Sequence, residues 1–244
     1  MGHLTQRRLL ELWESCLDVT AATRADALLR LAQPDAAPET LADLPLGERE
    51  RQLLGLRRSL LGRRMSASAA CPRCGEQHDV EFDVDALLDA FGDPAPATLT
   101  VRRDDFELTL RPLTGADLAA VAGLPDADVA SRMLLERTVL SAWRGEEELP
   151  TSTLSAVERT LVADALAEAD PLGDLRTPLE CAGCGHAWSP ALDAAAYLWL
   201  ELHDWALRLL RDVHELARAY GWTEDEVLGL SPWRRAAYLS LAGR

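Results

Sequence analysis

The chain has 244 residues, and 48% of them are hydrophobic, which is enough for a packed core and excludes wholesale disorder. The formal net charge is −15 and the pI is near 4.7, so the surface repels phosphate backbones and nucleic-acid binding is disfavoured. Residues 1–11 contain no continuous apolar run, and charged residues interrupt the most apolar stretch, residues 194–210. We therefore expect no signal peptide, no membrane span and a cytoplasmic protein.

Residues 5–62 are expected to form an N-terminal helical segment. Apolar residues recur at helical spacing over residues 5–31, and the lone Cys16 falls among them as a small core residue. Three prolines make residues 33–46 a loop with at most one short turn. A helix rich in Leu and Arg follows over residues 47–61. Its end carries a basic cluster that is either a solvated helix end or a docking patch: Arg57, Arg58, Arg63 and Arg64.

The hydrophobic pattern then changes from helical to alternating. Alternation predicts strands over residues 65–71 and 78–84, on either side of the turn Cys71-Pro72-Arg73-Cys74-Gly75. This CxxC turn is called the first knuckle. A helix is expected next, over residues 85–91.

Residues 92–174 are expected to form an inserted hairpin-and-helix lobe. A Pro/Ala linker precedes a hairpin of residues 99–102 and 106–111. Thr114 or Asp117 caps the next helix. The other expected elements are a helix over residues 129–143 with Met133, Leu134, Val139 and Leu140 on its apolar face, a solvated loop at Glu146, Glu147 and Glu148, and a helix from Ser152 or Ser155 to residue 169.

A second knuckle, Cys181-Ala182-Gly183-Cys184-Gly185, repeats the first far along the chain. Short strands are expected beside it at residues 175–180 and 186–192. If the two knuckles pair, residues 63–91 plus 175–193 form one small zinc-ribbon sheet. The predicted fold class is therefore α+β, mainly helical, with a small zinc-ribbon β element made from two distant CxxC knuckles.

The two knuckles predict a structural zinc site. A two-residue spacer lets both thiolates of a knuckle point at one ion, and the Gly after each second Cys permits the positive φ that turns backbone N–H groups toward sulfur. A redox dithiol and structural disulfides remain open but are disfavoured in a reducing cytosol. His78 or His186 as a substitute ligand is less favoured than a strand position for each. The expected zinc ligands are Cys71, Cys74, Cys181 and Cys184.

Residues 194–244 are expected to form a C-terminal helical segment that begins with a long helix over residues 194–220. A capping box at residues 223–226 starts a short helix, and Ser231 with Pro232 starts the last one, residues 233–241. Tryptophan is concentrated in the last quarter of the chain, where it either fills the core or supplies exposed interface anchors. These residues are Trp188, Trp199, Trp205, Trp222 and Trp233.

No catalytic constellation stands out in the sequence. It contains no Gly-rich phosphate loop, no GxSxG elbow and no HExxH motif. His203, beside Asp204 and near Glu201, fits an ordinary helix surface. Four thiolates close the coordination shell of an ion and leave no position for a reacting water. We predict that the protein is not an enzyme, with a metallohydrolase as the least favoured alternative.

Several segments together resemble the T4-type bacteriophage baseplate proteins, a family that includes a baseplate hub assembly chaperone. The resemblance covers most of residues 5–200, and the tail is similar to short helical units of phage tail morphogenesis proteins. The segments that carry it are Glu11-Leu12-Trp13-Glu14, Arg24-Ala25-Asp26-Ala27-Leu28-Leu29, Leu44-Pro45-Leu46-Gly47-Glu48-Arg49, Leu53-Leu54-Gly55-Leu56-Arg57, the first knuckle, and Leu110-Arg111-Pro112-Leu113-Thr114-Gly115-Ala116-Asp117-Leu118.

The resemblance implies a protein of a phage tail or of a phage-derived contractile injection system. Its implied partners are baseplate or hub proteins of a contractile tail, with no nucleic acid and no membrane. The favoured role is an assembly factor that is absent from the finished particle. A permanent structural baseplate subunit is the alternative, and a nucleic-acid-binding zinc ribbon is less favoured.

Overall fold

The computed structural model describes residues 5–243. The described residues divide into two compact units, one of residues 5–27 with 196–243 and one of residues 28–195. Residues 1–4, which belong to the stretch expected to lack a signal peptide, and Arg244, which ends the expected C-terminal segment, lie outside the described residues. Within residues 5–243, no helix combines the length and the apolar character that crossing a membrane requires. The fold is mainly helical with small antiparallel sheets, which confirms the coarse fold class.

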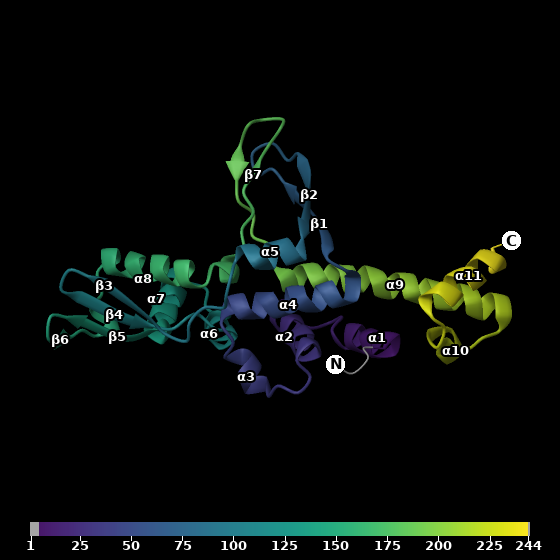
Figure 1. The fold of residues 1–244 in the computed structure, drawn as a ribbon, viewed down its shortest axis with the longest axis horizontal. Coiled ribbons are helices and arrows are strands. Elements are labelled where there is room, and N and C mark those ends of the chain that lie inside the picture. The colour runs from purple at the N-terminus through teal and green to yellow at the C-terminus, as the bar shows by residue number, and fades with distance from the viewer. Residues whose placement is uncertain (1–4, 244) are drawn as a thin grey trace. The chain divides into compact units, whose positions relative to one another are not determined.

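The unit of residues 5–27 and 196–243 is helical. Its core includes Val213, Leu216 and Val227, with Trp222 and Tyr238 packed against them. The expected capping box is confirmed, as is the proline start of the last helix. The helices with residues in this unit are α1 (Gln6–Ser15), α2 (Ala21–Ala32), α9 (Ala194–Tyr220), α10 (Glu224–Leu228) and α11 (Pro232–Ala242), as labelled in Figure 1.

Three helices of the second unit precede or follow the first knuckle: α3 (Pro38–Ala42), α4 (Leu46–Leu61) and α5 (Val84–Ala90). The short α3 is the one turn expected in the proline-rich loop, and α4 ends where Gly62 takes φ +89°. Three of the four arginines of the basic cluster at this end have partners within the fold. Arg57 is 4% exposed and donates to the Gly62 carbonyl at 2.6 Å, while Arg58 and Arg63 form ion pairs with carboxylates of the following elements.

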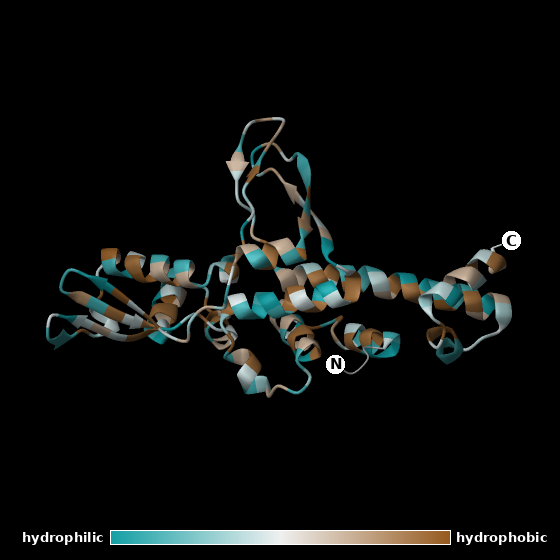
Figure 2. Cartoon of the chain, viewed as in Figure 1, coloured by the Kyte–Doolittle hydropathy of each residue, from teal (hydrophilic) through white to brown (hydrophobic). Residues whose placement is uncertain are grey.

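The inserted lobe contains a four-stranded antiparallel sheet in the order β3-β4-β5-β6, covered by helices. Leu108 and Leu110 of β4 are fully buried and pack in one core with Val162 of α8, and hydrophobic residues recur along these elements (Figure 2). Thr114 caps α6 in a capping box with Asp117, as expected. The elements are β3 (Leu99–Arg103), β4 (Phe106–Leu110), α6 (Gly115–Val121), α7 (Ala127–Thr138), β5 (Val139–Arg144), β6 (Glu147–Glu148), η1 (Thr151–Thr153), α8 (Ala156–Ala169) and η2 (Pro171–Asp174).

The helix predicted over residues 129–143 is wrong beyond residue 138. The Thr138 hydroxyl donates to the Leu134 and Leu135 carbonyls, and the chain then continues as β5, antiparallel to β4. Val139 is buried and Leu140 is 51% exposed, so the two residues do not share an apolar face. Pairing with a distant strand overrode the local helical pattern. The expected loop at Glu146–Glu148 contains the two-residue β6, whose side chains are exposed as predicted.

The two knuckle hairpins form separate sheets, which corrects the single ribbon sheet expected from the sequence. β1 (Arg64–Ala70) pairs with β2 (Gln77–Asp83) along seven residue pairs. β7 (Leu179–Glu180) and β8 (Ala187–Trp188) pair over only two, with one further bridge between Arg176 and Ala191. The strands expected over residues 175–180 and 186–192 are thus largely irregular. No hydrogen-bonded ladder joins the hairpins in the described chain. They meet at the cysteines and where the His78 ring of β2 packs edge-on against the Trp188 ring of β8, with centroids 5.4 Å apart.

Candidate metal centre

The two knuckles have the same backbone geometry. In the first, the Cys71 N–H donates to the Glu76 carbonyl and the Gly75 N–H donates to the Cys71 carbonyl, both at 2.8 Å. In the second, Cys181 and Gly185 make the equivalent bonds, to the carbonyls of residues 186 and 181, at 2.9 and 2.8 Å. Gly75 and Gly185 have φ of +79° and +67°, the positive values expected of these glycines. Each sequence motif therefore encodes its turn locally.

The structure brings the four cysteines of the two knuckles together. The Sγ atoms of Cys71 and Cys184 lie 3.7 Å apart, and those of Cys74 and Cys181 lie 3.5 Å apart. All four sulfurs lie within 4.8 Å of one another. A tetrahedral ion with metal–sulfur bonds of about 2.3 Å requires sulfurs roughly 3.8 Å apart, so this donor set fits such an ion. Both close pairs join different knuckles, and a metal here would link residues that are 107 to 113 positions apart in the chain.

The surroundings of the thiols shift the pKa values of Cys71 and Cys181 in opposite directions. Burial raises the pKa of the Cys71 thiol, but hydrogen bonds from the backbone N–H groups of Arg73 and Cys74 outweigh it and lower the pKa to about 7. Burial raises the pKa of Cys181 to about 12, and hydrogen bonds with Cys74 and Glu76 act in the same direction. A bound cation favours thiolates and would oppose this increase.

Glu76 is a neighbour of the centre that the sequence did not identify. Its Oε2 lies 3.3 Å from the Cys181 sulfur, and Glu76, His78 and Cys181 form a second, overlapping group of possible ligands. Its position in the sequence, directly after Gly75 of the first knuckle, could have identified it as a neighbour of the thiols. His186 belongs to neither group, and its ring stacks on Trp188 with centroids 6.3 Å apart.

Other candidate residues are dispersed. Cys16 is 4% exposed, as expected of a core residue. His203 accepts a hydrogen bond from the Trp13 indole at 3.0 Å, so it is a packed helix residue. The tryptophans of the last quarter divide between both interpretations, because Trp222 packs against the core of Val213, Leu216 and Val227 whereas Trp233 is 86% exposed.

A buried ionic network lies in the segment of residues 110–118. The Asp117 side chain is fully buried and accepts hydrogen bonds from Arg111 at 2.6 and 2.9 Å and from Arg137 at 2.6 Å. Burial raises the pKa of Asp117, but these bonds and those from Thr114 outweigh it and hold the pKa well below its usual range. The network joins the end of β4 to α6 and α7, so it is structural.

Fold and centre together define a mainly helical protein in which two distant CxxC turns meet as one four-thiol cluster. The model of the T4 bacteriophage base plate protein family matches residues 22–189, more than half of the chain. The chain therefore belongs to this family. The match contains the first knuckle, the inserted lobe and the second knuckle, and residues 190–244 lie outside it. No curated protein and no solved structure matches the chain.

Proposed function

We propose that the protein is a non-enzymatic, chaperone-like assembly factor for the baseplate or hub of a phage tail or phage-derived contractile injection system. Membership of the baseplate family is the observation that carries this proposal. The helical residues beyond the family match add support, because Trp233 on α11 is 86% exposed there. Exposed tryptophan is costly in water and is enriched at interface hot spots. A protein partner therefore fits this surface.

We further infer that the four-cysteine cluster holds one Zn²⁺. An all-sulfur donor set at tetrahedral spacing suits zinc, and the matched knuckle turns present the sulfurs without rearrangement. Four thiolates fill the coordination shell, so the ion supplies a cross-link and no reaction chemistry. Its role is to tie the β1–β2 hairpin to the β7–β8 hairpin.

A permanent structural subunit of the baseplate is the second candidate. The description of the matching family as a base plate protein favours it directly. Nucleic-acid binding has less support, because a net charge of −15 opposes contact with phosphates.

Timed depletion of the chain tests the assembly role. The gene is deleted from its tail cluster and the protein is supplied from a repressible promoter, and particles are examined by electron microscopy. We expect particles without complete baseplates when the protein is absent throughout. Particles assembled before depletion should stay intact under either candidate. Normal particles in its continuous absence would overturn both candidates.

A further inference from the structure

We propose that the groove between α7 and α8 binds one amphipathic helix of a partner baseplate protein, which places apolar side chains in the groove and a carboxylate beside Arg132 and Arg159. This inference rests on the proposed function and specifies the partner's chemistry. The groove is called the α7/α8 groove below.

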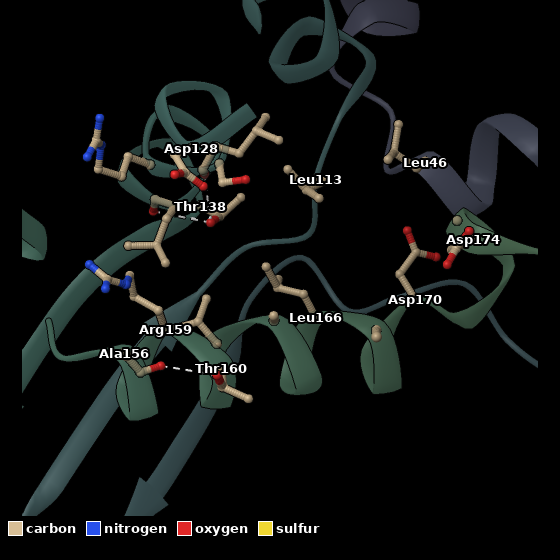
Figure 3. Close-up of a pocket in the computed structure, with 18 residues that line it drawn as sticks. Leu46, Leu113, Asp128, Thr138, Ala156, Arg159, Thr160, Leu166, Asp170 and Asp174 are labelled. Atoms are coloured by element: carbon tan, nitrogen blue, oxygen red, sulfur yellow. Dashed lines mark hydrogen bonds between the residues drawn. The ribbon is translucent and has the colours of Figure 1, made fainter. Parts of the chain in front are cut away.

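The α7/α8 groove has a volume of about 690 Å³ and lies within the unit of residues 28–195. In Figure 3, α8 runs along one side, from Ala156 and Arg159 at one end to Asp170 at the other. Thr138 of α7 lies opposite the first end, and Leu46 and Leu113 lie toward the second. The volume is in the range of recognition pockets, and it exceeds what a single apolar side chain fills.

The lining residues follow the helical period. On α8 they recur three or four positions apart from Ala156 through Thr160 and Ala163 to Ala167. This stripe spans most of the 14-residue helix, which is roughly 20 Å long at 1.5 Å per residue. A channel of that length, open along its side and walled by helices, matches a partner helix of three to four turns. Ala163 and Ala167 are exposed and small, so a partner backbone can approach closely.

The charges of the groove select the occupant. Arg132 and Arg159 form no ion pair with any described residue, and they stand at one end with a single carboxylate, Asp128. At the other end, Asp170 already accepts a hydrogen bond from the Gly47 N–H at 2.8 Å, and Asp174 forms an ion pair with Arg176. The unsatisfied charge is therefore positive and local, on a protein whose net charge is −15. A partner carboxylate at this end is complementary.

The same charge pattern disfavours a second copy of this chain. One exposed apolar helix face on another copy is that of α11, with Trp233 and Leu241 at helical spacing. That helix carries the exposed Arg234 and no carboxylate, whereas Arg235 is buried and paired with Asp212. Arg234 would repel the arginines of the groove, so a carboxylate-bearing helix of a different protein fits better.

Site-specific photocrosslinking tests the proposal. The photoreactive amino acid p-benzoylphenylalanine replaces Ala163 in the full chain, expressed together with its whole tail gene cluster, and crosslinked peptides are sequenced by mass spectrometry. We expect one segment of another cluster-encoded protein, with apolar residues at helical spacing and an acidic residue near one end. A synthetic peptide of that segment is then titrated against the purified protein.

Matched variants separate groove binding from folding. Ala163→Trp fills the groove and should abolish peptide binding, whereas Val157→Trp, on a 68% exposed position of α8 outside the groove, should leave it unchanged. Arg132→Glu with Arg159→Glu should weaken binding about 10-fold or more. Arg30→Glu with Arg103→Glu changes the net charge equally on exposed residues elsewhere, and it should have little effect.

The proposal is overturned by crosslinks only to a second copy of this chain, by crosslinks to no protein, or by peptide binding that the Ala163→Trp variant retains. Recovery of a bound fatty acid in native mass spectrometry in place of a protein would also overturn it. If particle assembly needs the chain but tolerates Ala163→Trp, the groove inference fails while the proposed function stands. If assembly does not need the chain at all, the proposed function fails.

Discussion

Removal of the metal should loosen the knuckle hairpins first. Two-stranded hairpins are marginal by themselves, and Met65 is the only residue of β1 or β2 that is buried. The Asp170 carboxylate accepts the Gly47 N–H and so holds α4 near η2 without any metal. The ion therefore has to order only two segments, the one from the end of α4 to Cys71 and the one from Asp170 to Cys181.

The magnitude follows from the length of these segments. The two segments together contain roughly 20 residues. Closing a loop of that length costs about 3 kcal/mol of chain entropy. If α4 and η2 were not already held together, the ion would close the whole loop between the two knuckles, and the entropy cost would be about 4 to 5 kcal/mol. For a protein of this size, 3 to 5 kcal/mol corresponds to a fall in Tm of roughly 6 to 20 °C.

The assay is thermal unfolding in reducing buffer with and without a chelator, together with metal analysis and hydrogen exchange. We expect about one zinc per chain, the stated fall in Tm, and the largest increase in exchange at residues 64–83 and 177–190. Cys74→Ser should reproduce the chelator effect, because Cys74 is exposed and contributes little packing. Arg73→Ser, in the same knuckle, is the matched control and should behave as wild type. Purified protein without zinc, or exchange that the chelator leaves unchanged, would contradict a zinc ion that holds the two hairpins together.

Three further predictions concern single side chains. Asp117→Ala leaves Arg111 and Arg137 without their buried partner and should lower the free energy of unfolding by about 3 to 5 kcal/mol, measured by denaturant titration. A loss below about 0.5 kcal/mol would show that the ionic network does not stabilise the fold. Burial raises the pKa of Glu50 from 4.5 to about 7, so the folded state binds this proton more tightly than the unfolded state does. The free energy of unfolding should therefore fall as the pH rises from 4.5 to 7, and Glu50→Gln should flatten that decline. An unchanged pH profile in the variant would contradict the prediction. Trp233→Ala should change the free energy of unfolding by less than about 0.5 kcal/mol yet impair particle assembly in complementation tests, whereas marked destabilisation would mean that the side chain serves the fold.

Local chemistry explains which features the sequence could predict. The CxxC-Gly turns, the Thr114 and Thr223 caps and the proline start of α11 depend on residues within a few positions of one another. Such motifs fix their own backbone geometry, so they can be recognised without the rest of the fold.

Features that depend on distant partners were not predictable in the same way. Val139 has a helical neighbourhood in sequence, and only pairing with β4 makes it a strand residue. The knuckles met as expected, but the number of paired residues in β7 and β8 depends on how the chain enters and leaves the second hairpin. The α7/α8 groove arises from two helices that no local pattern places side by side.

The central claim is that the protein acts during baseplate assembly and then leaves. Quantitative mass spectrometry with isotope-labelled peptides, applied to purified mature particles and to assembly intermediates from the same cells, tests it most directly. We expect the chain in intermediates, together with a hub or baseplate protein, and far below one copy per particle in mature particles. Stoichiometric chain in mature particles would contradict the claim and identify the protein as a permanent baseplate subunit.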